Sequence, residues 1–207
     1  MPITNPKPVF LSFVHYFRAI AILSIVAGHV YYTFEWPENN FHLLITKAVI
    51  LNSSVLFVFI SGFLFQHLIA NFNYRKFLPV KYRNVLLPYI IMSLPIIIIR
   101  VIIGKPTGFL ENVYPGFSDW DYFRQSLFYL ITGTHLRSYW FIPMMAVFYL
   151  IAPLLVTLDK HSRYYLPLLI CLLIFTSIIP RSVSLWPWWQ TIYFLPSYIL
   201  GMYVSRN

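Results

Sequence analysis

The chain has 207 residues, of which 59% are hydrophobic and only 10% are charged. Soluble globular proteins are about half apolar and about one quarter charged, so this composition excludes an ordinary soluble domain and indicates an integral membrane protein. The formal net charge of +9 does not call for a nucleic-acid partner, because lysine and arginine accumulate on the cytoplasmic loops of membrane proteins.

About six apolar runs are long enough, or nearly long enough, to cross a bilayer as helices. We expect these spans at residues 10–34, 43–70, 85–104, 139–158, 164–179 and 186–204. The apolar piece near 122–132 is too short to span, and we predict an interfacial or re-entrant helix there. No repeat or flexible linker divides the chain, so the sequence predicts one all-α, polytopic integral-membrane domain over residues 1–207.

Positive charge is concentrated on alternate loops of this topology. If the N-terminus lies in the cytoplasm, the cytoplasmic segments carry a single acid, Asp159. Their basic residues are Lys7, Arg75, Lys76, Lys81, Arg83, Lys160, Arg163 and Arg206. The other acids fall on the opposite side with fewer basic residues. The sequence therefore predicts a multi-pass protein with both termini in the cytoplasm.

The first predicted span contains two ionisable residues, Arg18 and His29. Such residues are costly within a membrane and usually mark a functional path. Eleven residues at about 100° each return to within about 20° of the starting direction, so the two positions share one helix face, about 16 Å apart. The alternatives are an arginine that snorkels to the cytoplasmic rim and a histidine that bonds to a neighbouring helix.

Five stretches of the chain resemble segments of the membrane-bound acyltransferase-3 family, in the family's order. The stretch FRAIAILSIVAGH, which holds Arg18 and His29, resembles the family's opening helix. The others are FVFISGFLF (57–65), RKFLPVKYRNVLLPY (75–89), SYWFIPMMAVFYLIAPLL (138–155) and YFLPSYILGMYVSRN (193–207). The resemblance implies an enzyme of the bacterial inner membrane that transfers an acyl group, expected to be acetyl, from cytoplasmic acyl-CoA to a hydroxyl of a cell-surface or lipid-linked glycan.

The resemblance also assigns roles to individual residues. His29 is expected to take the proton from the sugar hydroxyl, since an imidazole titrates near neutral pH. Arg18 is expected to hold the polar end of the donor by bidentate hydrogen bonds. Lys81 and Arg83 resemble the family's paired arginines, although a lysine keeps the charge and loses the planar fork. A positive-inside anchor is the alternative for both. Acyl-CoA is a co-substrate, and no bound cofactor is expected.

Three residues are candidates for contact with the acceptor on the outer side. Trp140 matches a family position but also reads as an interface aromatic. Asp119 and Asp121 are placed to touch a glycan, with a solvated loop as the alternative. The histidines lack the spacing of metal ligands and Cys171 is the only cysteine, so no metal site is expected.

A second function fits the same intramembrane charges. Arg18 and His29 would equally line the polar path of a non-catalytic transporter or scaffold. Members of the family usually have further spanning helices, so the sequence also fits a truncated product, an inactive fragment, or a short member that works as a homo-oligomer. The expected partners are the lipid bilayer, acyl-CoA and the glycan acceptor. A nucleic-acid partner is not expected.

Overall fold

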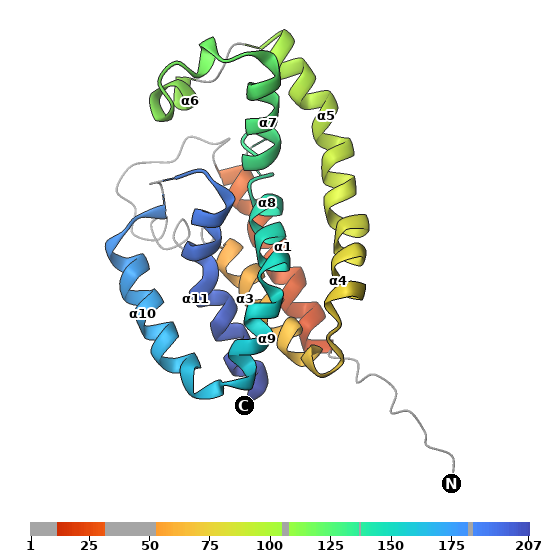
Figure 1. The fold of residues 1–207 in the computed structure, drawn as a ribbon, viewed down its shortest axis with the longest axis vertical. Coiled ribbons are helices and arrows are strands. Elements are labelled where there is room, and N and C mark those ends of the chain that lie inside the picture. Colours follow the sequence, from red (N-terminus) through yellow and green to blue (C-terminus); the bar gives the residue numbers. More distant parts are fainter. Residues whose placement is uncertain (1–11, 32–52, 105–107, 137, 182–183) are drawn as a thin grey trace. The chain divides into compact units, whose positions relative to one another are not determined.

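The computed structural model describes residues 12–31, 53–104, 108–136, 138–181 and 184–207. Every regular element within these ranges is helical, and none of them contains a strand, which confirms the all-α prediction for this part of the chain (Figure 1). The described residues form two compact units, divided at Leu68/Ile69 and again at Pro196/Ser197. Helix α11 (Pro187–Arg206) contributes to both units. The single-domain prediction stays a prediction.

Unit 1 contains α1 (Ser12–Tyr31), α3 (Ser53–His67) and the C-terminal part of α11. Helices α1 and α3 pack through Ala21 and Ile60, which are buried. Small residues let α3 and α11 approach closely, as is usual for packed membrane helices. A Cβ atom added at Gly62 would collide with the carbonyl oxygen of Tyr198. The close contact between α3 and α11 therefore requires a residue without a side chain at position 62.

Unit 2 begins with a rod made of three consecutive elements. These are α4 (Tyr74–Lys81), the π-helix η2 (Tyr82–Leu86) and α5 (Leu87–Ile102). The side-chain oxygen of Asn73 caps the rod by accepting a hydrogen bond from the amide of Lys76, at 3.2 Å. This cap explains why the basic segment 71–84, which we predicted to be a loop, is helical from Tyr74 onward.

The π-helical turn lies immediately before a proline. The amide of Leu87 donates to the carbonyl of Tyr82, five residues earlier. In a regular α-helix the ring of Pro88 would press on the carbonyl of Asn84 and leave it without a donor. The widened turn occurs at the point where this conflict would arise. Such turns are frequent at functional sites.

The rod is also the clearest membrane-span candidate in the described part of the chain. Tyr74–Ile102 is long and apolar enough to cross a bilayer as one helix. The pair α8 (Phe141–Leu150) and α9 (Ala152–Lys160) passes the same test together, but it is bent by 53° at the break. Pro153 explains the bend, because proline disturbs the preceding turn.

The other predicted spans are shorter helices or are not fully described. His15–Gly28 within α1, Ser53–His67, and Ser162–Ile178, which contains α10 (Tyr165–Ile178), are apolar but have fewer than 18 residues. The predicted span at 43–70 begins among residues that lie outside the described part. One span, or two if the bent pair is one, is therefore what the described helices support by length and composition. The expected six remain a prediction.

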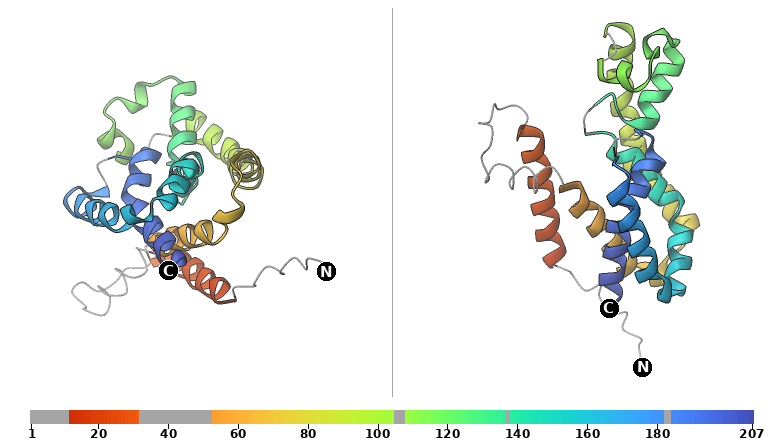
Figure 2. Two further views of the ribbon diagram at one scale, coloured as in Figure 1. Left: turned by 60° about the horizontal axis from the view of Figure 1, so that its bottom comes forward. Right: turned by 90° about the vertical axis from the view of Figure 1, so that its left-hand side faces the viewer.

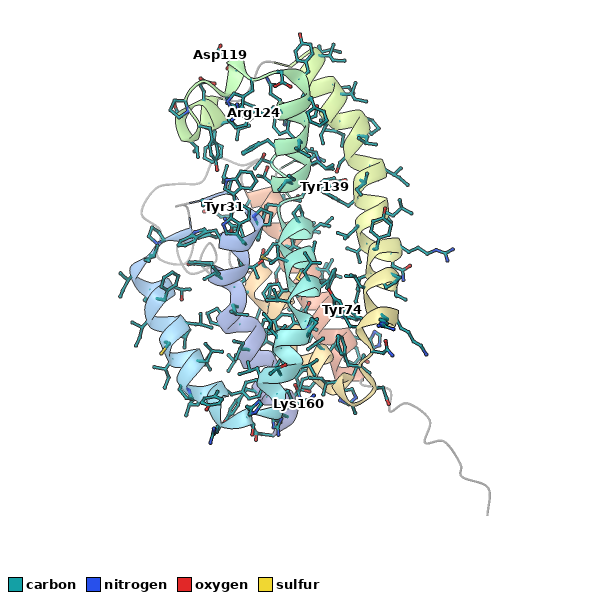
Figure 3. The ribbon with its side chains drawn as sticks, viewed as in Figure 1. Tyr31, Tyr74, Asp119, Arg124, Tyr139 and Lys160 are labelled. Atoms are coloured by element: carbon teal, nitrogen blue, oxygen red, sulfur yellow. The ribbon has the colours of Figure 1, made fainter. Side chains whose placement is uncertain are left out.

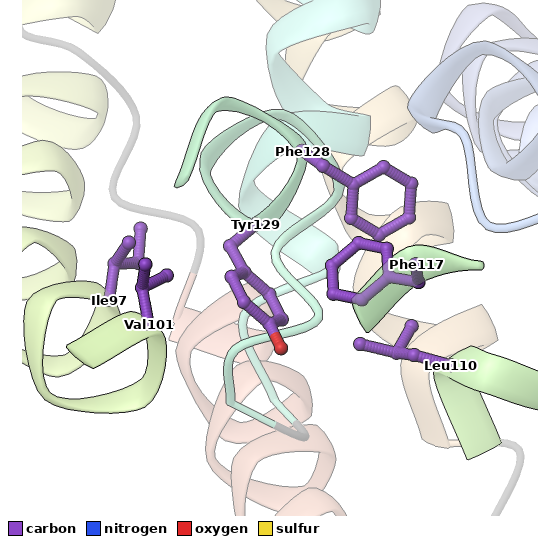
Figure 4. Close-up of a cluster of buried hydrophobic side chains, with 6 residues drawn as sticks. All are labelled: Ile97, Val101, Leu110, Phe117, Phe128 and Tyr129. Carbon is purple, nitrogen blue, oxygen red and sulfur yellow. The ribbon is translucent and has the colours of Figure 1, made fainter. Parts of the chain in front are cut away.

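The end of α5 supports a small aromatic core. Helices α6 (Gly108–Val113) and α7 (Tyr122–Thr132) and the short turn η3 (Phe117–Asp119) lie against it. The cluster consists of Ile97, Val101, Leu110, Phe117, Phe128 and Tyr129, all of which are buried (Figure 4). The short helix expected near 122–132 is confirmed as α7, while its placement at a membrane interface stays a prediction.

Helix α7 ends at a glycine that the fold requires. Gly133 has a φ of 71°, in the left-handed region where side chains are strained. A Cβ atom here would also lie 2.5 Å from the backbone of Tyr139 and Trp140. The end of α7 therefore lies close to the residues that precede α8.

Unit 2 has two ends with different loops. Helices α6 and α7 lie at one end, while α4 and the end of α9 lie at the other in both vertical views (Figures 1 and 2). Asp119 and Arg124 are at the first end and Lys160 is at the second (Figure 3). Residues that the sequence assigns to opposite sides of a membrane thus lie at opposite ends of this unit.

Candidate functional site

The two residues that led the prediction lie on one unbroken helix of unit 1. Helix α1 runs without interruption from Ser12 to Tyr31 and therefore through positions 18 and 29. The Arg18 side chain is exposed. The His29 side chain lies outside the described part, so the shared face follows from helix periodicity alone and stays a prediction.

The predicted donor residues lie on the rod of unit 2. Lys81 is the last residue of α4, and Arg83 lies in the π-helical turn. The Lys81 ammonium sits 5.4 Å from the ring centroids of both Phe77 and Tyr149. These cation–π contacts restrict where the Lys81 charge can move. Arg83 is exposed. Arg18 belongs to unit 1.

The predicted acceptor-side acids have different surroundings. Asp121 caps α7 by accepting a hydrogen bond from the amide of Arg124 at 2.9 Å, which gives it a structural task. Asp119 ends η3 and is exposed. Glu111 accepts from the Ser118 hydroxyl at 2.7 Å and from the Gly116 amide at 2.7 Å. These bonds lower the pKa of Glu111 below its ordinary value. A glycan contact for Asp119 or Asp121 stays a prediction.

The third acceptor-side candidate, Trp140, belongs to a cluster that the sequence did not reveal. The guanidinium carbon of Arg181 lies 3.8 Å from the Trp140 ring centroid and 5.0 Å from that of Phe194. The two rings stack at 5.6 Å with an interplanar angle of 24°. The Nε–H of Arg181 donates to the side-chain oxygen of Gln190 at 2.5 Å. We call these four residues the Arg181 cluster.

A second layer fixes the cluster. The Gln190 side-chain nitrogen donates to the carbonyl of Ser184 at 2.6 Å, so its oxygen faces Arg181. Gln190 is buried, at 4% exposure, and Arg181 is half-buried. Burial lowers the pKa of Arg181 to about 10, which still leaves it a cation at neutral pH. No carboxylate in the described part of the chain forms an ion pair with it.

A buried histidine lies near the junction of α7 and α8. His135 is fully buried, with Nδ1 2.9 Å from the Tyr129 carbonyl and Nε2 2.9 Å from the Ser93 hydroxyl. A carbonyl only accepts, so Nδ1 carries the proton and Nε2 accepts from Ser93. His135 is therefore a satisfied, neutral core residue. Within the described part, no group of His, Cys, Asp or Glu is arranged to hold a metal ion.

Comparison with known proteins supplies the family. Residues 11–207 match a family model, Acyl_transf_3, that is described as an acyltransferase domain. No curated protein and no solved structure matches the chain. The match includes α1 with Arg18 and His29 and continues through the rod and the Arg181 cluster to the last residue. The chain therefore belongs to the acyltransferase-3 family.

Proposed function

We propose that this protein is a multi-pass acyltransferase of the bacterial inner membrane. It would transfer an acyl group, acetyl in the first instance, from cytoplasmic acyl-CoA to a hydroxyl of a cell-surface or lipid-linked glycan. The observation that carries the general acyl-transfer role is the family match over residues 11–207. The identities of the donor, the acyl group and the acceptor are proposals that go beyond the family match.

The distribution of charge in unit 2 supports the two-sided arrangement. Basic residues with few acids lie at the end that holds α4 and the end of α9, as Lys160 illustrates in Figure 3. Such an end suits the cytoplasmic face, where lysine and arginine are retained and where a polyanionic donor is available. Asp119 lies at the other end, which we assign to the outer face.

In the proposed reaction His29 acts as the general base. It takes the proton from the sugar hydroxyl while that oxygen attacks the thioester carbonyl of the donor. The tetrahedral intermediate collapses with cleavage of the carbon–sulfur bond, and the leaving thiolate takes the proton from the imidazolium. Arg18, Lys81 and Arg83 would bind the phosphates of the donor. The products are an O-acylated glycan and free CoA, and no bound cofactor takes part.

The test uses inner membranes that carry the chain, labelled acetyl-CoA, and extraction of the cell-envelope glycan. We expect label in the glycan with the unmodified chain and at least about a hundredfold less with His29→Ala, the usual range for loss of a general base. The control is His15→Ala, an exposed histidine on the same helix, which should leave transfer unchanged.

Two outcomes would count against this proposal. Label retained by His29→Ala would remove the assigned role of that histidine and leave the transferase. Absence of label from the unmodified chain, when immunoblotting shows it in the membrane, would contradict the glycan-acylation function and favour the transporter interpretation.

A further inference from the structure

We infer that the Arg181 cluster is a binding site for an acidic group, a carboxylate or a phosphate, on the acceptor glycan. The inference rests on the proposed function, because that function supplies a glycan at the outer face. It goes further by assigning a charge to the glycan and a residue that recognises it.

The guanidinium of Arg181 is held by two kinds of contact. Its central carbon lies 3.8 Å from the Trp140 ring centroid and 5.0 Å from that of Phe194. Gln190 fixes the Nε edge. A guanidinium held by cation–π contacts and by one edge has a restricted orientation, so little conformational entropy is lost when a ligand binds to its remaining edge.

The Nη groups of Arg181 are available as donors. A guanidinium has five N–H groups, and the one on Nε is used by Gln190. Those on Nη1 and Nη2 make no hydrogen bond within the described part of the chain. Arg181 is half-buried, so its side chain is partly accessible to a ligand. Two parallel N–H groups match the two oxygens of a carboxylate or phosphate.

Arg181 has no counter-charge among the residues that the structure describes. Arg181 is half-buried, and a partly desolvated cation is more favourable when an anion lies beside it. None of the described acids on the predicted outer side forms an ion pair with Arg181: Glu111 bonds to Gly116 and Ser118, Asp121 bonds to the amide of Arg124, and Asp119 is exposed. The counter-ion is therefore expected to come from a ligand.

The location of the cluster indicates which ligand this is. In the predicted topology, Trp140 lies at the outer start of a span, Arg181 follows the outer end of the next, and Gln190 lies in the first turns of the last. The acyl donor enters from the other side. An exposed, mobile cation would suffice for a lipid head group, whereas a fixed fork suits one acidic substituent on a larger molecule.

The experiment measures binding without turnover, on the full chain purified in uncharged detergent at fixed ionic strength. Two matched probe pairs are used: a uronic-acid oligosaccharide with its carboxyl-reduced counterpart, and a sugar phosphate with the dephosphorylated sugar. We expect at least one acidic probe to bind about tenfold or more tightly than its neutral partner, since hydrogen bonds to charged groups are worth roughly this much.

The variants separate binding from folding. Arg181→Gln should abolish the preference for the acidic probe, and Arg181→Lys should keep part of it, because lysine keeps the charge without the fork. Arg163→Gln is the matched control: Arg163 also stacks on a ring, that of Tyr164, at 4.8 Å. This control should behave like the unmodified chain. If Arg181→Gln does not fold, the preference for the acidic probe is compared between Arg181→Lys and the unmodified chain. A weaker preference in Arg181→Lys supports the inference, and an equal preference contradicts it.

The inference is overturned if neither pair shows a preference for the acidic probe, or if the preference survives in Arg181→Gln. It is also overturned if Arg181 affects only the affinity for nanodiscs rich in anionic lipid. Failure of the proposed function would look different: the chain would bind the acidic probe without transferring label from acetyl-CoA. A chain that transfers label to glycan but shows no preference for the acidic probe would contradict this inference and leave the proposed function intact.

Discussion

His135 is held in one protonation state by its two neighbours. The Tyr129 carbonyl needs the proton on Nδ1, and the Ser93 hydroxyl donates to Nε2. Burial, and to a lesser extent the positive charge of Arg100, lower the pKa of His135, against the hydrogen bond to Tyr129, which raises it. Adding a second proton would break the bond from Ser93 and place a charge in the core.

This geometry predicts a loss of stability in acid. Above about pH 6.5 His135 is neutral in both the folded and the unfolded chain, and it adds no pH dependence. Below that value the unfolded chain takes up the proton first, so the free energy of unfolding falls as the pH falls toward the lowered pKa of the folded state. The measurement is the thermal unfolding midpoint in detergent between pH 8 and pH 5.

The variant His135→Gln keeps hydrogen-bonding groups at the site and removes the titration. It should be less stable at pH 8, by about 1–3 kcal/mol for an imperfectly satisfied buried group, and should lose less on acidification. Curves that fall in parallel for the two proteins would show that His135 is not the group responsible.

At the scale of elements, the contact between α3 and α11 depends on two glycines. A Cβ at Gly62 meets the Tyr198 carbonyl, and a Cβ at Gly201 meets the Phe59 carbonyl. Backbone atoms cannot move aside as a flexible side chain can, so the helices would have to separate. The adjacent Ser61 hydroxyl donates to Phe57 of its own helix at 2.9 Å and is not part of this restriction.

We therefore expect Gly62→Val to lower the free energy of unfolding by about 1–3 kcal/mol, the usual range for overpacking. Ser61→Ala, one position earlier on the same helix, should change it by far less. Thermal unfolding followed by circular dichroism in detergent measures both. An equal loss for the two variants would mean that the close approach of α3 to α11 is not what limits stability.

The elements also differ in how far sequence alone predicts them. Helix α10 was expected at 164–179 and spans Tyr165–Ile178, because a continuous apolar run between charged or proline-containing turns has few alternatives. Helix α4 was not predicted. The charges of this segment indicate the cytoplasmic side but do not indicate its backbone conformation, and the only local signal for a helix start is one capping residue, Asn73. A hydropathy pattern does not predict the bend before Pro153, because the bend results from a single proline and not from the distribution of apolar residues.

The candidate site divides in the same way. Arg18 and His29 can be paired from sequence because both lie on α1, where helix periodicity relates them. Arg181 and Trp140 are 41 residues apart and meet only through the packing of three helices, which no local pattern encodes. The only sequence signal for Arg181 was a lone cation in a short turn that we assigned to the outer face.

At the scale of the whole molecule, the proposed topology predicts which residues can be labelled from each side. Cys171 is the only cysteine, so Cys171→Ser gives a background without thiols. In that background we expect Asp119→Cys to react with a membrane-impermeant maleimide added to intact spheroplasts. Lys160→Cys should react only after the membrane is opened.

The readout is the mass shift of the purified chain, with a permeant maleimide as the control that both thiols are reactive. Labelling of both positions in intact spheroplasts, or of neither, would contradict the assignment of these two residues to opposite faces. Such a result would contradict both the outer location of the Arg181 cluster and the cytoplasmic location of Lys81 and Arg83, because the two assignments rest on the same topology.

The π-helical turn at Tyr82–Leu86 sets how α4 is rotated about the axis of the rod relative to α5. Such a turn holds one residue more than a regular turn would. If the same residues closed into a regular α-helix with none removed, α4 would turn about its axis by about 100° relative to α5. The side chains of α4, Lys81 among them, would then face a different direction although every charge was kept. The widened turn therefore sets the direction in which the basic residues of α4 point.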